Sequence, residues 1–266
     1  LWVVLFLVFP VFGGLFYIFV SFQSSTRWAK DRLERLERDS GSFLPDHSAY
    51  EDACNALPDR VPQLHYLQTS GFPVYMHTVC DYFSPGEKLF AVLLTELEKA
   101  ERYIFLEFFI LEEGVMWDAI HGILQRKVQQ GVKVRVLYDD MGSFLTLPRD
   151  FPGCLEKEGI HCQVFNRFRP VLSSLQNNRD HRKIVSIDGK VAFTGGFNLA
   201  DEYINVKEKH GHWKDAGIRL HGEAAWGLTL MFLQMWNLVN QQTEDFAQYV
   251  PCLLYTSPSP RDPKTS

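Results

Sequence analysis

The residues whose types and spacing suit chemistry lie in one short segment, DHRKIVSIDGKVAFTGGFN, at 180–198. His181 and Lys183 are two residues apart, so in a strand their side chains point to the same face. Histidine can act as a covalent nucleophile, and lysine can balance the charge of phosphoryl oxygens. Gly195 and Gly196 leave the backbone open, and Asn198 adds an amide able to bind an oxygen. These groups favour a phosphate site; an exposed hairpin with incidental polar residues is the alternative.

A turn inside this segment separates the polar groups into two strands. Asp188 and Gly189 form a strong hairpin signal between a strand that begins near His181 and a return strand over 191–194. This geometry places Asp188 at the turn and away from His181. We therefore expect Asp188 to have a structural role, either capping the turn or pairing with a nearby base.

Alternating strands and amphipathic helices must position the segment. Short apolar runs predict strands, and apolar residues three and four apart predict helices. The predicted strands are 74–83, 103–110, 132–138 and 160–165, and the predicted helices are 86–100, 116–130, 155–159 and 226–240. This order is typical of an α/β sandwich with a mixed, partly parallel sheet flanked by helices. Glu107 is the only charge in the buried run YIFLEFFI, where a charge is either paired or functional.

The start of the chain, LWVVLFLVFPVFGGLFYIFV, contains no charged residue. Twenty helical residues span about 30 Å, the thickness of the bilayer hydrocarbon core, so we expect a transmembrane helix over 1–22. A signal peptide or a buried core helix fits this length and composition less well. Lys and Arg then cluster in a juxtamembrane helix and linker over 23–70. The positive-inside rule predicts that the following domain, 71–250, is cytoplasmic.

The end of the chain indicates how far the natural sequence extends, and the overall composition disfavours some classes of protein. Residues 252–262 resemble one reading frame of a sequencing adapter, so we expect 251–266 to be foreign and the natural chain to continue past about Val250; a disordered tail is the alternative. The net charge is −5, from 27 Lys and Arg against 32 Asp and Glu, which argues against binding nucleic acid by bulk positive charge. The five cysteines are scattered, which disfavours a disulfide framework or a structural zinc site.

The full motif H-x-K-x(4)-D-x(6)-G-G-x-N resembles the signature of the phospholipase D superfamily. It is met by His181, Lys183, Asp188, Gly195, Gly196 and Asn198. The apolar start, VRVLYDDMGS, RFRPVLSSLQNNRDHRK and HGHWKDAGIRLHG extend the resemblance to bacterial cardiolipin synthases over roughly residues 1–240. The resemblance implies a phospholipase D-like fold and an enzyme of the bacterial cell membrane.

The resemblance also implies a two-step phosphatidyl transfer. His181 would attack the phosphodiester of one phosphatidylglycerol, expel glycerol and carry the phosphatidyl group to a second phosphatidylglycerol, which gives cardiolipin. Lys183 and Asn198 would hold the nonbridging oxygens, Gly195 and Gly196 would line the substrate site, and no metal or other cofactor would be needed. Related enzymes carry an acid about thirty residues after the motif histidine, so Asp215 is our candidate for fixing its tautomer. Glu107 is the second candidate and is otherwise expected to contact substrate.

The chain departs from the family pattern because it holds one motif where cardiolipin synthases have two. The other H-x-K, at His212 and Lys214, has Arg219 where the aspartate is required. Either the missing half or a second copy of the chain must complete the site, and we expect the chain alone to be inactive as a synthase. A phospholipase or nuclease acting as a single-motif homodimer is the alternative enzyme, and a membrane-anchored scaffold is the non-catalytic one.

Overall fold

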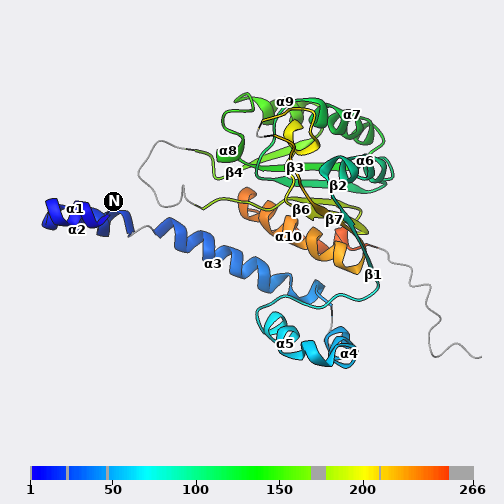
Figure 1. The fold of residues 1–266 in the computed structure, drawn as a ribbon, viewed down its shortest axis with the longest axis horizontal. Coiled ribbons are helices and arrows are strands. Elements are labelled where there is room, and N and C mark those ends of the chain that lie inside the picture. The colour runs from blue at the N-terminus through cyan, green and yellow to red at the C-terminus, as the bar shows by residue number, and fades with distance from the viewer. Residues whose placement is uncertain (1, 22–23, 46–47, 169–177, 210, 252–266) are drawn as a thin grey trace, which may run out of the picture.

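The computed structural model describes residues 2–21, 24–45, 48–168, 178–209 and 211–251, and its centre is a seven-stranded sheet (Figure 1). The strand order is β1-β7-β6-β5-β2-β3-β4. The strands are β1 Thr78–Phe83, β2 Tyr103–Phe108, β3 Lys133–Asp139, β4 His161–Phe165, β5 Ile184–Ile187, β6 Val191–Gly195 and β7 Gly217–Gly222. The pairs β2–β3 and β3–β4 are parallel and the other pairs antiparallel, which confirms the predicted mixed sheet.

Helices cover both faces of this sheet. One face carries α6 Gly86–Leu97, α7 Val115–Gln129 and α9 Phe151–Lys157, and the other carries α10 Glu223–Asn240 (Figure 1). The short elements are α8 Asp140–Ser143 and the 3-10 helices η1 Gly41–Phe43, η2 Pro58–Arg60, η4 Asp201–Ile204 and η5 Phe246–Tyr249. The predicted sandwich is therefore confirmed.

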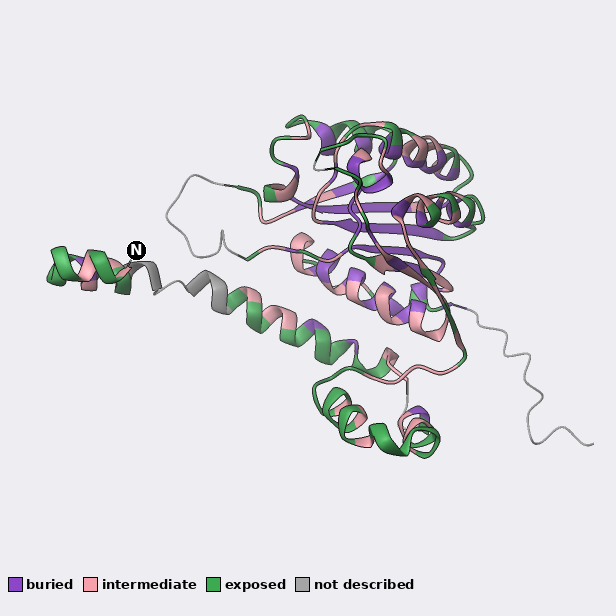
Figure 2. Cartoon of the chain, viewed as in Figure 1, coloured by how far each residue is buried: buried purple, intermediate pink, exposed green. Residues whose placement is uncertain are grey.

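The central strand β2 shows why the sheet is buried on both sides. Alternate side chains leave opposite faces of a strand, so Tyr103 and Phe105 pack toward α10 while Ile104 and Leu106 pack toward α6 and α7. The ring of Phe105 stacks on that of Phe232 with a centroid distance of 4.7 Å. Figure 2 shows the buried residues concentrated along the strands and on α10. An apolar run without alternation is thus explained by helices on both faces.

Strands β5 and β6 form the predicted hairpin. Asp188 has φ 54° and Gly189 has φ 69°, both in the left-handed region, and the Lys190 amide donates to the Ile187 carbonyl oxygen at 3.0 Å. These values are typical of the turns that match the twist of paired strands. Because β5 begins at Ile184, both His181 and Lys183 lie in the extended segment just before the strand.

The N-terminal residues form two helices, α1 Trp2–Val8 and α2 Pro10–Ser21, where one transmembrane helix was predicted over 1–22. Their rings pack together, with the centroid of Trp2 5.3 Å from that of Tyr17; in one straight helix these residues would be about 22 Å apart. The chain reverses where Pro10, which has no N–H to donate, begins α2. Within the described residues no helix combines the length and apolar character needed to cross a bilayer, so the structure does not support the predicted single span.

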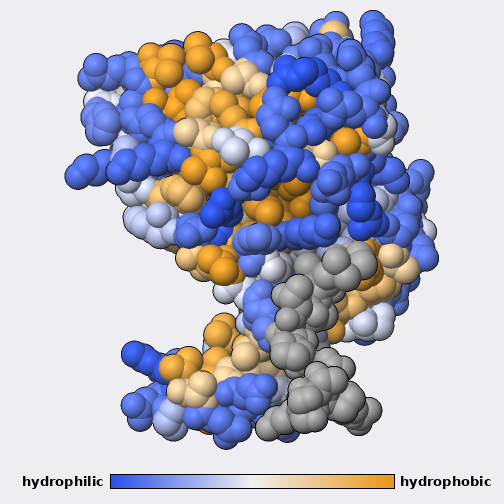
Figure 3. Space-filling model, turned by 90° about the vertical axis from the view of Figure 1, so that its right-hand side faces the viewer, coloured by the Kyte–Doolittle hydropathy of each residue, from blue (hydrophilic) through white to orange (hydrophobic). Residues whose placement is uncertain are grey.

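The charged helix predicted after the apolar start of the chain is present as α3 Ser24–Asp39, which follows α2 and lies along α10 (Figure 1). The Arg32 guanidinium donates to the Gln242 carbonyl oxygen at 3.0 Å. Helices α4 Ser48–Ala56 and α5 Val61–Thr69 then form a small lobe set off from the sheet domain (Figure 3). The predicted foreign tail falls at 252–266, outside the described residues.

Candidate active site

His181 is exposed at the end of the sheet where β5 begins. Its ring lies against the ring of Phe109, with a centroid distance of 4.8 Å. Among the described residues no side chain or backbone group forms a hydrogen bond with its ring nitrogens. The imidazole is therefore held by an apolar contact and keeps both nitrogens available to a ligand.

Lys183 lies beside the backbone of His181 and is only 4% exposed. Its Nζ donates to the His181 carbonyl oxygen at 2.7 Å and lies 5.5 Å from the centre of the Phe109 ring. Burial lowers the pKa of Lys183, and the carboxylates of Asp180 and Asp215 partly oppose this shift. The structure thus places a poorly solvated cation beside the candidate nucleophile, where an anionic phosphoryl group would restore its charge balance.

Gly195 and Gly196 are exposed where β6 ends, and Asp215 lies directly against the second of them. A Cβ on Gly196 would be 2.5 Å from Asp215 Oδ1, so only glycine fits there without a shift. Asp215 Oδ2 accepts from the Trp213 indole at 3.1 Å, and Oδ1 accepts from the Ala216 amide at 2.7 Å. Asp215 enters β7 beside β6 as expected, but its carboxylate forms no hydrogen bond to His181 among the described residues.

Asn198 is buried just beyond the two glycines and bonds to the protein itself. Its Oδ1 accepts from the Ile110 amide at 3.0 Å, and its Nδ2 donates to the Tyr203 hydroxyl at 2.8 Å. One N–H of the amide remains for another acceptor. In this structure Asn198 ties the loop after β6 to the end of β2, and its expected contact with substrate stays a prediction.

Glu107 is fully buried beneath the segment that carries His181. Its carboxylate lies 2.7 Å from the Arg182 guanidinium, which also donates to Asp180 at 3.0 Å. Complete burial raises the pKa of Glu107 well above its ordinary value, against the opposing effect of Arg182. Burial tends to lower the pKa of Arg182, but the two carboxylates outweigh it and hold the guanidinium charged. Glu107 therefore contacts the chain beneath the site, and its expected substrate contact stays a prediction.

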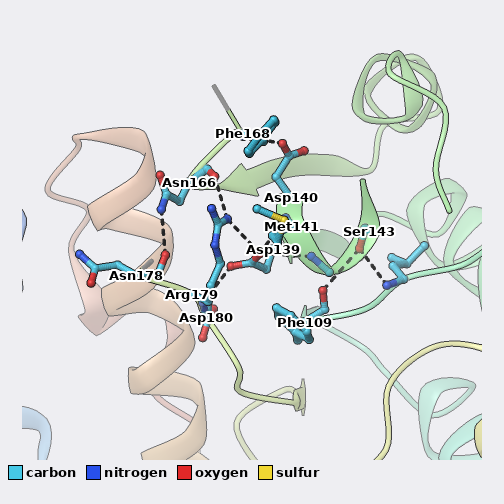
Figure 4. Close-up of polar contacts among 12 residues, drawn as sticks. Phe109, Asp139, Asp140, Met141, Ser143, Asn166, Phe168, Asn178, Arg179 and Asp180 are labelled. Carbon is cyan, nitrogen blue, oxygen red and sulfur yellow. Dashed lines mark hydrogen bonds and ion pairs between the residues drawn. The ribbon is translucent and has the colours of Figure 1, made fainter. Parts of the chain in front are cut away.

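From the sequence alone, the pair Asp139 and Asp140 after a buried strand predicts a pocket rim or a loop cap. In the structure Asp139 joins the end of β3 to α8 and to the segment before β5 (Figure 4). Its fully buried carboxylate accepts from the Asp180 amide at 2.9 Å, from Arg179 at 3.2 Å and from the Met141 amide at 2.9 Å. Burial raises the pKa of Asp139, and these donors oppose the shift. The Met141 contact caps α8, so the cap is confirmed. The link to Asp180 was missed, although two aspartates at the end of a buried strand were the signal for it.

Asp188 occupies the hairpin turn, at the opposite end of β5 from His181. Its carboxylate accepts from three consecutive backbone amides, Glu101 at 2.9 Å and Arg102 and Tyr103 at 2.8 Å each. The motif aspartate thus fixes the start of β2 to the β5–β6 turn. This geometry agrees with a structural role, which only mutagenesis can test.

No three His, Cys, Asp or Glu side chains come together to hold a metal ion in the part of the chain that the structure describes. The positive groups near His181 are side chains, chiefly Lys183 and Arg182. The arrangement as it stands can bind an anionic oxygen and attack an electrophile beside it.

Comparison with known proteins identifies the class to which this fold and site belong. Residues 93–211 match a family model described as "Cardiolipin synthase, PLD-like domain", a stretch that includes His181, Lys183 and Asn198. The chain belongs to the phospholipase D superfamily.

Within that superfamily the chain is similar to cardiolipin synthases. It is 30% identical over 269 residues to "Cardiolipin synthase" of Oceanobacillus iheyensis and 43% identical over 258 residues to an "Uncharacterized protein" of Streptococcus mutans. Each alignment covers 94% of this chain and 54% of the relative, so the chain spans about half the length of these relatives. A solved structure, the phospholipase D family member Nuc from Salmonella typhimurium, is 16% identical with a TM-score of 0.45, covering 64% of this chain and 98% of that one.

Proposed function

We propose that this chain contributes a phosphatidyl-transfer site, in which His181 takes a phosphatidyl group from phosphatidylglycerol and passes it to a second phosphatidylglycerol. The products are cardiolipin and glycerol. The proposal is supported by the exposed imidazole of His181, which contacts Phe109 and forms no hydrogen bond among the described residues, and by the buried ammonium of Lys183, which bonds to the His181 carbonyl oxygen. It is also supported by the similarity to cardiolipin synthases.

The proposed reaction has two steps that balance. In the first, a ring nitrogen of His181 bonds to phosphorus, the phosphorus–oxygen bond to the headgroup glycerol breaks, and the departing oxygen takes a proton. In the second, a hydroxyl of another phosphatidylglycerol attacks phosphorus, the phosphorus–nitrogen bond breaks, and the hydroxyl proton leaves. Lys183 stabilises the charge on the nonbridging oxygens in both steps. The exposed backbone at Gly195 and Gly196 lets those oxygens approach closely.

Both steps need a proton donor and acceptor that faces His181. In the described residues no carboxylate bonds to its ring, so we propose that a second motif histidine supplies this group. It would come either from another half of the protein or from a second copy of this chain. The lipid substrates imply a bacterial membrane, and the exposed apolar side chains on α1 and α2 support attachment to it. The cytoplasmic placement of the domain stays part of the proposal.

The experiment uses vesicles of phosphatidylglycerol whose headgroup glycerol is isotopically labelled, with products identified by mass spectrometry. Phosphatidyl transfer to lipid gives labelled free glycerol with cardiolipin, whereas transfer to water gives glycerol with phosphatidic acid. A rate that rises with the square of the chain concentration would assign the second histidine to another copy. Under any condition in which the unchanged chain releases glycerol, alone or together with a partner that carries the second motif, the variant His181→Ala is expected to release none. Cleavage of DNA without glycerol release would overturn the proposal in favour of the nuclease alternative.

A further inference from the structure

A cavity of about 590 Å³ opens at the ends of β3 and β4, close to the candidate nucleophile. Its lining includes Tyr138, Ser143, Phe144, Leu147, Arg149 and Arg167. Apolar and polar side chains share the wall, which carries two guanidinium groups and the carboxylate of Asp140. Neither the motif nor the proposed transfer step uses these residues.

Two residues, Ser143 and Phe109, connect the cavity to His181. The Ser143 hydroxyl, which lines the cavity, donates to the Phe109 carbonyl oxygen at 3.4 Å and accepts from the Leu111 amide at 3.0 Å. The Phe109 ring then contacts His181 on its other side. Figure 4 shows the hydrogen bond between Phe109 and Ser143, which lie to one side of Asp139 and Asp140. Ser143 and Phe109 therefore stand between a molecule in the cavity and the imidazole.

Large apolar side chains are exposed around the mouth of this cavity. Leu145 is 92% exposed, and Met141, Phe144 and Phe168 are each exposed by 40% or more. The rings of Phe144 and Phe168 pack edge to face with a centroid distance of 5.4 Å. The backbone beneath them is fixed, because Asp139 caps α8 and the Thr146 hydroxyl donates to the Leu111 carbonyl oxygen at 2.7 Å. The fold thus presents four apolar groups to solvent from a well-bonded turn.

Among the described residues, the two arginines at the same mouth have no carboxylate partner. Arg149 and Arg167 are both exposed, and neither forms an ion pair in the ranges that the structure describes. Other exposed cations do find partners there, such as Lys207 with Glu112 at 2.8 Å. The nearby Asp140 carboxylate accepts from the Phe168 amide at 2.6 Å. Unpaired positive charge beside exposed apolar groups complements a ligand that is anionic at one end and apolar at the other.

We infer that this edge, defined as Met141, Phe144, Leu145, Arg149, Arg167 and Phe168, docks the domain onto a bilayer containing anionic phospholipid. The guanidinium groups bind lipid phosphate and the four apolar side chains enter the acyl boundary. The inference rests on the proposed function, because docking there presents lipid phosphodiesters to His181. A second copy meeting this edge across a twofold axis would bring like charges together. Nucleic acid would leave the aliphatic side chains of Met141 and Leu145 without a partner.

The test measures hydrogen exchange by mass spectrometry on the full chain with vesicles. Vesicles containing phosphatidylglycerol are expected to slow exchange of the amides in 141–149, and vesicles of phosphatidylcholine alone are not. The double variant Arg149→Gln with Arg167→Gln should weaken retention on the anionic vesicles about thirty-fold. The control, Arg60→Gln with Lys88→Gln, removes the same charge from two exposed sites elsewhere and should retain binding.

Three results would overturn the inference. Equal protection of these amides on both kinds of vesicle would show that the arginines do not bind anionic lipid. Protection without vesicles that grows with protein concentration would assign the edge to a second copy, and protection by an oligonucleotide alone would assign it to nucleic acid. The variant His181→Ala should dock normally. If the unchanged chain docks normally but forms no phosphatidyl adduct on His181 with an activated phosphatidyl diester, that result would contradict the proposed function and leave the docking edge intact.

Discussion

Replacement of Asp188 separates a structural role for the motif aspartate from a catalytic one. Its carboxylate accepts from three consecutive amides at the start of β2, those of Glu101, Arg102 and Tyr103. The Tyr103 amide is buried, whereas the other two are partly buried and can bind water after the change. A bond to a charged acceptor contributes about 1.5–3 kcal/mol, so Asp188→Ala should lower the free energy of unfolding by about 4 kcal/mol.

Asp188→Asn is the matched variant, because asparagine tolerates the left-handed φ of 54° and keeps one acceptor oxygen. We expect it to lose about half as much, ~2 kcal/mol. Chemical denaturation followed by far-ultraviolet circular dichroism gives both values, with the transition slope as a check on the unfolded state. In either variant, the fraction of chain that remains folded should form the phosphatidyl adduct on His181 at the wild-type rate. Two results would refute the structural role of Asp188. One is a loss of stability below about 1 kcal/mol for the alanine variant, and the other is a stable variant that forms no phosphatidyl adduct on His181.

Three further predictions concern the groups around His181. Arg182→Leu removes the shared partner of Glu107 and Asp180 and should cost about 3–5 kcal/mol in the denaturation assay. Glu107→Gln should cost below about 1 kcal/mol, because the guanidinium keeps the Asp180 carboxylate and the amide keeps one acceptor oxygen; equal costs would contradict the pairing. Gly196→Ala should destabilise by about 1–3 kcal/mol through the clash with Asp215, while Gly153→Ala, whose Cβ meets open space, serves as the control. Burial lowers the pKa of Lys183 in the folded chain, so between that pKa and 10.5 the unfolded chain binds more protons. The free energy of unfolding should therefore rise with pH across that interval. The rate at which His181 forms the phosphatidyl adduct should fall across the same interval, because Lys183 loses its charge. Lys183→Arg should move the fall to higher pH, and an unchanged profile would show that another group titrates.

Local pattern accounts for much of the fold but for little of the contact network behind the site. The hairpin and the apolar strands follow from turn residues and periodicity, which act over a few positions. The partner of Glu107 did not follow, because the register of β2 against β5, in which Glu107 pairs with Ile184, brings distant residues together. For the same reason the bond from Asp139 to the Asp180 amide was missed.

The helices α1 and α2 show the opposite difficulty, because composition alone predicted a single long helix where the structure has two short ones. An uncharged run of sufficient length predicted one span, yet the run contains Pro10, and the chain reverses there so that Trp2 packs on Tyr17. Hydropathy reports where a segment is apolar, and it does not report whether a proline inside the segment bends the helix or divides it.

The most direct test of the central claim is to trap the intermediate on His181. A phosphatidyl diester with a nitrophenol leaving group needs no general acid, so it should react even where the second motif histidine is missing. We predict a burst of nitrophenolate equal to the amount of folded chain. Mass spectrometry under alkaline conditions should find the phosphatidyl adduct on the peptide containing His181, and His181→Ala should show neither burst nor adduct. A burst that survives in His181→Ala, or an adduct on another residue, would contradict the assignment of His181 as the nucleophile.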